Sequence, residues 1–424
     1  MTRRRHERLD WGLRAVLLAS FFNTFAFIGL ITFVGDQVFS ISRQELDLGL
    51  LALFLFLPIF VLSPIGGTVA DRIDRRLVWA VPTVVNIVVA IGITVYTRSE
   101  PSSVWPFFAF VSVLGAARAF AAPASRSLPI DLAPPEVLDR VIALKAMSYQ
   151  SGIIVGPVVA GFAAVVAPEL PYIIAAVLYG VVLVLLTQIP KPEIEQLDSA
   201  PGLVQAFSDA VDGMRYVRRN PIVFGAISLD LFAVLLGGAT ALLPAVAEER
   251  LGVGEVGLGW LRAADGIGAA GMSLFLAYVT LRRRIGKILL ISVGVFGVAT
   301  IALGFTSNYG VAFAAIVVLS AADAISVYIR SSLVPLATPE AMRGRVIALE
   351  NVFIGGSNEL GALESGVAAQ FLGLVWAVVT GGIGTLGIVA LWWKFFPALR
   401  DVDSFEDVRV DVKTAGEAQA LPDG

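Results

Sequence analysis

The sequence predicts an all-α membrane protein with twelve transmembrane helices, arranged as two pseudo-symmetric six-helix bundles. Three observations predict it: an apolar composition, a series of apolar windows of spanning length, and a repeat between the two halves. The chain of 424 residues is 57% hydrophobic and only 15% charged. A soluble domain, in which about a quarter of the residues are charged, could not hide this much apolar surface from water.

The apolar windows define the helices. A helix needs about 20 apolar residues to cross the hydrocarbon core of a bilayer. Twelve windows meet this requirement: 12–35, 48–70, 77–97, 105–128, 141–166, 170–189, 221–246, 255–280, 288–305, 310–332, 345–371 and 373–396. The first is too long for a signal-peptide core and no small-residue cleavage site follows it, so we expect it to be retained as a helix.

One connection is longer and more polar than the others. It joins the sixth and seventh windows and contains an amphipathic run from Leu203 to Val217, which we expect to lie on the membrane surface. We therefore predict four regions: an N-terminal six-helix bundle with a short basic cytoplasmic tail (1–189), a cytoplasmic linker with an amphipathic helix (190–220), a C-terminal six-helix bundle (221–396), and an acidic, disordered cytoplasmic tail (397–424).

The distribution of lysine and arginine predicts the orientation. With the amino terminus inside, the inner connections collect most basic residues, and the outer ones hold little more than Arg43, Arg98 and Arg250. This asymmetry is the positive-inside pattern. We expect a multi-pass protein of the cytoplasmic (inner) membrane with both termini in the cytoplasm.

The two halves share a sequence repeat. The segment that begins at Arg126 and continues to Arg140-Val-Ile-Ala-Leu144 recurs from Arg330 to Arg345-Val-Ile-Ala-Leu349. The basic turn Arg75-Arg76 has a counterpart in 282–287. A duplicated bundle of this kind is typical of a transporter whose site lies between the halves.

The residue inventory argues against catalysis. The chain has no cysteine, and its one histidine, His6, lies in the basic tail. We therefore expect no metal site, no Ser/His or Cys/His nucleophile and no enzyme activity. The sequence also has no Gly-rich phosphate loop, so we expect no cofactor and an ion gradient as the energy source. A receptor would need a sizeable signalling domain, which the short tail does not supply.

A charged turn between the second and third windows carries a family resemblance. Gly67-x-Val-Ala-Asp71-Arg72-x-x-Arg75-Arg76 resembles the loop signature of the major facilitator superfamily, with Asp74 where that family usually has glycine. The resemblance implies a cytoplasmic gate formed by Gly67, Asp71, Arg72, Arg75 and Arg76, in which Asp71 and Arg75 clamp the inner side closed. The alternative is that the arginines only follow the positive-inside rule.

The residues also suggest a local role for Asp71. We expect it to begin the next helix, where a carboxylate suits the positive end of the helix dipole. It could equally bridge to a helix of the other half.

The fifth window contains a glycine-rich face. Gly152, Gly156 and Ala160 recur every four residues, so another helix can approach closely, and Pro157 should bend the helix beside them. With Gly161, this pattern resembles the helix 5 motif of exporters, which implies a hinge and seal. The alternative is ordinary small-residue packing.

Other segments resemble one branch of the superfamily. Leu114-x-x-x-Arg118 resembles part of a second superfamily motif. The Arg-Val-Ile-Ala-Leu repeats and Asn358-Glu359-Leu-Gly resemble the enterobactin-exporter and macrolide-efflux branch. This resemblance favours the proton as the coupling ion.

Ionisable residues inside spans are costly and therefore suggest function. The candidates for coupling and cavity charges are Arg118, Asp230, Asp265, Asp323 and Glu359. Arg118 and Asp323 occupy equivalent positions of the repeat, and we hypothesise that they form a buried charge cluster with Asp230 nearby. The alternative is a static ion pair, and Asp265 can likewise be neutralised by Arg262. We expect Glu350 to be solvated or paired with a loop arginine.

The remaining site prediction is a substrate cavity. The candidates are Phe22, Asn23, Phe25, Tyr149 and Asn358. An aromatic cavity with few charges suits bulky amphipathic molecules such as drugs or siderophores, although each ring could instead face lipid. We therefore expect a proton-coupled exporter (antiporter) that works by alternating access. The alternative is a facilitator or importer of a nutrient, lipid or metal ion. The expected partners are the small-molecule substrate and the lipid bilayer, with no nucleic acid, and we expect a monomer.

Overall fold

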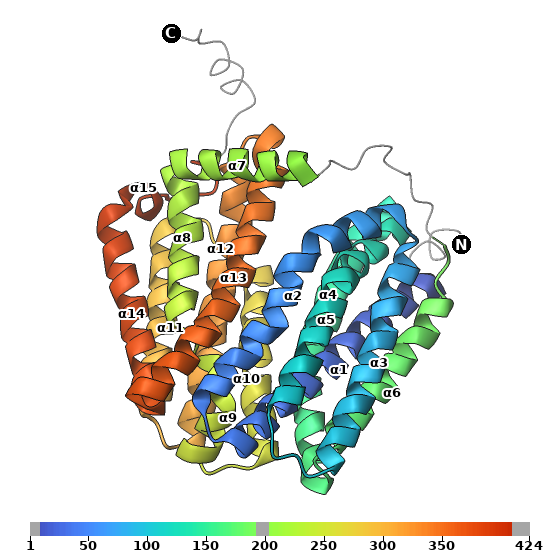
Figure 1. Ribbon diagram of the computed structural model, residues 1–424. Coiled ribbons are helices and arrows are strands. Elements are labelled where there is room, and N and C mark those ends of the chain that lie inside the picture. The colour runs from blue at the N-terminus through green and yellow to red at the C-terminus, as the bar shows by residue number, and fades with distance from the viewer. Residues whose placement is uncertain (1–8, 192–202, 409–424) are drawn as a thin grey trace. The chain divides into compact units, whose positions relative to one another are not determined.

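The computed structural model describes residues 9–191 and 203–408, and every regular element in these ranges is helical (Figure 1). The predicted all-α fold is confirmed, and eleven of the twelve windows each correspond to one long helix, whereas the seventh is interrupted. Ten helices among the described residues are long and apolar enough to cross a membrane. The eighth and eleventh windows lie on two further long helices, α10 (Glu255–Tyr278) and α13 (Glu340–Leu372).

The described residues form two compact units by their internal contacts. The first unit combines 1–200 with 241–266, and the second combines 201–240 with 267–424. The predicted division at 190–220 stays a prediction. The basic tail up to residue 8, the linker residues 192–202 and the tail residues 409–424 lie outside the described residues.

The first unit contains the first six long helices. They are α1 (Trp11–Ser42), α2 (Glu45–Arg72), α3 (Arg75–Arg98), α4 (Trp105–Leu132), α5 (Leu138–Val166) and α6 (Leu170–Thr187), with the short η1 (Pro135–Val137) before α5. Helix α1 packs on α5 and α6, while α4 packs on α2 and α3. Two clusters of buried side chains hold them together, one around Leu30 and Phe107 and the other around Trp79 and Leu128.

The seventh window is broken. Helix α8 (Pro221–Leu236) ends before Gly237-Gly238, and η2 (Ala239–Leu242), α9 (Leu243–Ala245) and η3 (Val246–Arg250) follow. A Cβ at Gly238 would lie 2.5 Å from the carbonyl oxygen of Gly361 on α13. The break therefore occurs where the backbone passes too close to α13 for any side chain.

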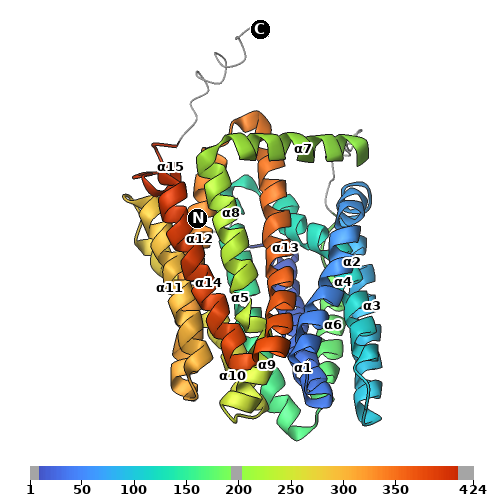
Figure 2. The same cartoon turned by 60° about the vertical axis from the view of Figure 1, so that its left-hand side comes forward.

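The second unit is built on α8, α11 (Ile285–Phe305), α12 (Tyr309–Leu336), α13 and α14 (Leu374–Phe395). Helix α11 packs on α12 and α14, and α8 packs on α13 and α14. The amphipathic run forms α7 (Leu203–Arg219), which lies across the ends of α8 and α13 (Figures 1 and 2). Tyr216 on α7 donates a hydrogen bond of 2.7 Å to the carbonyl of Ala337.

The start of the predicted disordered tail is folded. Residues 397–408 begin with the short α15 (Pro397–Arg400), and Leu399 is fully buried against the second unit. The amide of Gly286 donates to the carbonyl of Val402 over 3.0 Å. Leu399 and Val402 bury apolar side chains against the second unit, which stabilises this segment. The prediction of disorder was wrong for residues 397–408, because it used the acidic composition of the whole tail and not these two residues.

Candidate functional site

The charged turn differs from the expectation in one respect. Asp71 lies in the last turn of α2, so the prediction that it begins the next helix was wrong. That position belongs to Asp74, the N-cap of α3, whose carboxylate accepts a hydrogen bond of 3.0 Å from the amide of Arg76. The side-chain hydrogen bond from Arg76 lowers the pKa of Asp74 below its ordinary value. The departure from glycine thus supplies a helix cap.

Arg75 joins this turn to α4. Its guanidinium forms an ion pair with Asp131 near the end of α4, and its Nη2 lies 3.8 Å from Asp71 Oδ1. The side chain of Asp71 is 56% exposed, whereas that of Arg75 is 16% exposed. Arg72 is exposed, and a Cβ at Gly67 would meet no atom within 4 Å. The gating role stays a prediction, and Asp131 is a partner that sequence reasoning missed.

The glycine face of α5 makes close helix contacts within the first unit. A Cβ at Gly156 would lie 2.7 Å from the carbonyl oxygen of Phe25 on α1, and one at Gly152 would lie 2.8 Å from Thr24 Cβ. At the other end, a Cβ at Gly161 would lie 2.7 Å from the carbonyl oxygen of Glu255 on α10. A Cβ at Gly259 of α10 would lie 2.4 Å from the carbonyl oxygen of Pro157. The helix can therefore touch α1 and α10 only through small residues.

The second unit contains a buried ion cluster. Arg330 on α12 places Nη2 2.7 Å from Asp230 Oδ1 on α8 and Nη1 3.8 Å from Glu350 Oε1 on α13. The three side chains are 3%, 7% and 10% exposed. The expectation that Glu350 is solvated or paired with a loop arginine was wrong, because its partner belongs to a long apolar helix. Two carboxylates share one guanidinium here.

Asp323 lies next to this cluster. It lines a small cavity of about 10 Å³ together with Asp230 and Ser326, which is close to the lower limit for holding one water molecule. The predicted proximity of Asp230 and Asp323 is therefore visible within the second unit.

Arg330 is absent from the predicted coupling and cavity charges. In the repeat it is only the first residue of a motif, although it lies inside the predicted window 310–332. An arginine inside a span is the same signal that selects Arg118. The position of Arg330 inside an apolar window was therefore a signal in the sequence, and the structure shows this arginine to be the partner of Asp230.

The first unit encloses a larger cavity of about 540 Å³ between α1, α3, α4, α5 and α6. Three of the predicted residues line it: Asn23, Tyr149 and Arg118. The guanidinium of Arg118 lies 4.3 Å from the ring centroid of Phe27, a cation–π contact. Arg126 and Lys145 also line this cavity, and neither was predicted.

The other predicted residues lie elsewhere. Phe22 packs against Phe21 and the buried cluster around Trp79. The backbone of Phe25 lies close to Gly152 and Gly156 of α5. Asn358 on α13 donates to the carbonyl of Ile354 over 2.8 Å. Glu359 is its partly buried neighbour, and Asp265 lies on α10 in the first unit. The hypothesis that Arg118 and Asp323 pair stays a prediction, because the two residues belong to different units.

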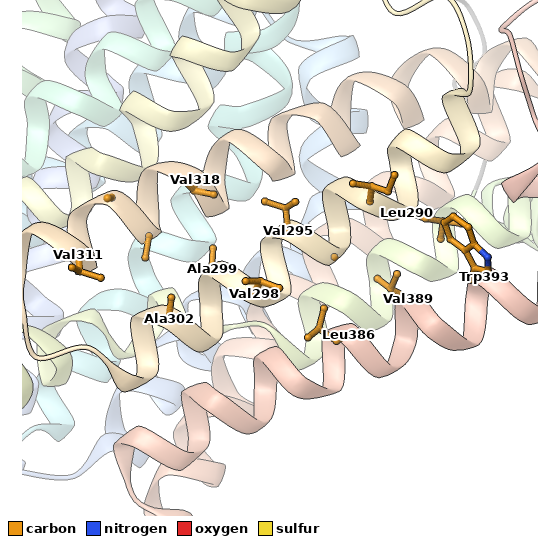
Figure 3. A pocket seen from close by; sticks show the side chains of 14 residues that line it. Leu290, Val295, Val298, Ala299, Ala302, Val311, Val318, Leu386, Val389 and Trp393 are labelled. Atoms are coloured by element: carbon orange, nitrogen blue, oxygen red, sulfur yellow. The ribbon is translucent and has the colours of Figure 1, made fainter.

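A third hollow, of about 610 Å³, is an apolar groove of the second unit (Figure 3). Its side chains come from α11, α12 and α14, and Figure 3 shows the indole of Trp393 at one end of the row. Its lining within residues 9–191 and 203–408 includes no charged or hydroxyl side chain. A polar solute would find almost no group to orient it there, so the candidate functional residues are those of the cavity in the first unit and the ion cluster in the second.

Known proteins resemble nearly the whole chain. Residues 18–414 match the transmembrane secretion effector family of major facilitator type. The chain is 26% identical over 372 residues to the uncharacterized MFS-type transporter YfiS of Bacillus subtilis strain 168, across 84% of this chain and 86% of that protein. It is 22% identical over 414 residues to the lysophospholipid transporter LplT of Photorhabdus laumondii, across 92% of this chain and 97% of that protein.

A solved structure matches the fold. A crystal structure of the nucleoside transporter NupG superposes with a TM-score of 0.73 and 12% identity, over 91% of this chain and 100% of that chain. At this identity the likeness shows the fold alone. It agrees with the predicted twelve-helix architecture.

Proposed function

Because this chain belongs to the transmembrane secretion effector family of the major facilitator superfamily, we propose that it exports amphipathic small molecules in exchange for protons. The coarser statement needs no proposal: the chain is a multi-pass membrane transporter of major facilitator type. The proposal adds the direction, the coupling ion and a substrate class such as drugs or siderophores. The motifs that resemble the enterobactin-exporter and macrolide-efflux branch support this class.

The observation that carries the proposal is the cluster of Asp230, Arg330 and Glu350. Burying an ion costs several kcal/mol unless it is paired. Arg330 neutralises one carboxylate, and Asp230 lies closer to it than Glu350 does, at 2.7 Å against 3.8 Å. Glu350 is therefore the carboxylate whose charge is less well compensated, and a proton on Glu350 makes the three side chains neutral together.

This excess of one acid gives a simple coupling cycle. When Glu350 holds a proton, the cluster is neutral and stable in an apolar surrounding. When the proton leaves, the net negative charge must meet water, which favours the arrangement of the helices that admits it. A transporter that alternates between two such arrangements can move protons one way and substrate the other.

The remaining predicted parts fit into the same cycle. Gly67, Asp71, Arg72, Arg75 and Arg76 form the predicted cytoplasmic gate. Asp131 joins it as a further partner, since the ion pairs of Arg75 with Asp71 and Asp131 connect α2, α3 and α4. The small residues of α5 form the seal with α1 and α10. The protein works as a monomer in the cytoplasmic membrane with both termini inside, without a cofactor, and draws on the proton gradient.

A second candidate function is the facilitated movement of a lipid or nutrient. The likeness to a lysophospholipid transporter over 92% of the chain favours a lipid among these substrates. Such a carrier would need no proton coupling.

Proteoliposomes with an imposed pH gradient distinguish the two functions. The full chain is reconstituted and challenged with a cationic dye, a macrolide, a siderophore and a lysophospholipid. Export by antiport predicts that a substrate dissipates the gradient and is moved against its own concentration. Flux of the same compound at an unchanged rate without a gradient would contradict the proposal and favour the facilitator.

A further inference from the structure

The repeat places unlike residues at equivalent positions of the two units. Arg126 and Arg330 begin the two copies of the segment, and Lys145 and Glu350 each follow the motif Arg-Val-Ile-Ala-Leu directly. Asp230 stands ten residues after the N-cap Asn220 of α8, and Ser20 stands ten residues after the N-cap Asp10 of α1. The acids of the second unit thus correspond to a serine and a lysine in the first.

This exchange changes the charge balance around the arginine. In the second unit, Asp230 and Glu350 both pair with Arg330, so two acids face one arginine. In the first unit, Ser20, Arg126 and Lys145 all line the cavity of about 540 Å³, and Arg118 adds a third cation to its wall. Among the described residues that line this cavity there is no aspartate or glutamate. The cavity is therefore cationic, whereas the equivalent region of the other half has two acids against one arginine.

Three polar groups of the same cavity wall have no partner. Trp79 Nε1, Asn86 Oδ1 and Tyr179 Oη are buried and make no hydrogen bond within the part of the chain that the structure describes. Trp79 and Tyr179 are fully buried, and Asn86 is 8% exposed. Buried polar groups without partners are rare, and two of these three are donors. They offer hydrogen bonds to a bound molecule.

The cationic side chains of this cavity keep N–H donors that are available for a ligand. Lys145 Nζ donates to the backbone carbonyl of Arg126 over 2.6 Å, which leaves two of its three N–H groups. The guanidinium carbon of Arg118 lies 4.3 Å from the ring centroid of Phe27, and a guanidinium has five N–H donors. Arg126 is exposed to the cavity side of α4.

We propose that this cavity binds an amphipathic organic anion, with its carboxylate or phosphate between Arg126 and Lys145. Arg118 and the donors Trp79 and Tyr179 assist, and the apolar body of the ligand lies against Phe27, Ile28, Leu114 and Ile142. The volume is that of a pocket for a drug-sized molecule. This inference rests on the proposed transport function and narrows its substrates to anions.

Binding of matched amphiphiles tests the charge preference. The full chain is purified in a maltoside detergent and titrated with dodecyl phosphate and dodecylphosphocholine, which share one tail and differ in head-group charge. Dodecyl phosphate is expected to bind at least tenfold more tightly. Both head groups carry an anionic phosphate, but dodecylphosphocholine adds a choline cation that Arg118, Arg126 and Lys145 repel. Equal affinity for the two probes would overturn the proposal.

Substitutions locate the site. Arg126→Gln and Lys145→Gln should each weaken dodecyl phosphate binding by about tenfold. Arg14→Gln, an exposed cation of α1 outside the cavity wall, should leave it unchanged. Unchanged affinity in both cavity variants would overturn the proposal.

A charge transplant gives the sharpest test. The double variant Ser20→Asp with Lys145→Glu places the acids of the second unit at the equivalent positions, where they can neutralise Arg126. It should lose the preference for dodecyl phosphate and keep the melting temperature within a few degrees. A folded double variant with full affinity for the anion would contradict the proposal.

The source of the anion is distinguished by two probes. Lysophosphatidylglycerol represents an anion from the bilayer, and dodecyl phosphate represents a soluble one. Binding of either supports the site and identifies its source, and binding of neither overturns it. If a pH gradient still drives a cationic dye when no anion binds, the inference fails while the proposed transport function stands. If the anion binds but no gradient-driven flux is found, the transport proposal fails instead.

Discussion

Arg330 Nη2 lies 2.7 Å from Asp230 Oδ1, and both side chains are less than a tenth exposed. The pair links α8 to α12, and Glu350 brings α13 to the same guanidinium. One arginine thus holds three helices of the second unit together. The same arginine balances only one of the two acids, which is why we propose this cluster as the site of proton coupling.

Removal of the arginine should be severe. Arg330→Gln leaves two buried carboxylates without their cation, and we expect a loss of about 3–5 kcal/mol in the free energy of unfolding. The double variant with Asp230→Asn should recover part of this loss, because one unpaired charge disappears. Thermal unfolding in detergent measures both. A single variant as stable as the wild type would contradict the ion cluster.

The α5 face predicts a steric effect. Gly156→Ala places a Cβ 2.7 Å from the carbonyl oxygen of Phe25, and we expect a loss of about 1–3 kcal/mol from the forced backbone shift. Gly180→Ala on α6 is the matched control, since a Cβ there meets nothing within 4 Å. The control should keep or raise stability. Equal melting temperatures of the two variants would argue against the close contact of α1 and α5.

The cap of α3 predicts a pH dependence. The hydrogen bond from Arg76 lowers the pKa of Asp74 in the folded protein, so its contribution is present above about pH 4, the ordinary aspartate pKa. It is lost as the pH falls through the lowered native value. Asp74→Asn keeps the cap but removes the titration, and Asp74→Ala should cost about 1 kcal/mol at neutral pH. Acid unfolding curves that coincide for wild type and Asp74→Asn would contradict this account.

The gate predicts a separation of stability from transport. Asp71 is 56% exposed and contributes little to stability through its ion pair with Arg75. Asp71→Asn should therefore leave the melting temperature unchanged. It should nevertheless slow transport severalfold in proteoliposomes, because it removes the proposed contact between Asp71 and Arg75 at the gate. Asp131→Asn removes the partly buried partner of Arg75 and should lower the melting temperature. A wild-type transport rate for Asp71→Asn would contradict the gating role of Asp71 and leave positive-inside topology as the explanation of this charged segment.

The helices were predictable because spanning length and apolar composition are local properties. The broken seventh window was not, since Gly237-Gly238 interrupts the helix for contact with Gly361, which is distant in sequence. The same limit applies to charges. The apolar windows identified Asp230 as buried, but only the packing of α8 on α12 reveals Arg330 as its partner.

The charged segment between α2 and α3 shows that a motif can be recognised while the helix boundaries within it are not. The signature located the charged connection between α2 and α3, yet Asp71 lies in the last turn of α2 and Arg75 begins α3, so the capping role belongs to Asp74. A shift of three residues decides which carboxylate meets the helix N-terminus. The two further cations of this cavity were not predicted, because Arg126 entered only as the first residue of a repeat and Lys145 lies one residue beyond its end at Leu144.

Glu350 provides the most direct test of proton coupling. Substrate-evoked proton flux is measured in proteoliposomes for wild type, Glu350→Gln and the control Glu340→Gln, an exposed acid at the start of the same helix. We predict that Glu350→Gln folds and binds substrate but loses proton flux and uphill export, while the control keeps both. Full proton-driven export by Glu350→Gln would contradict the account.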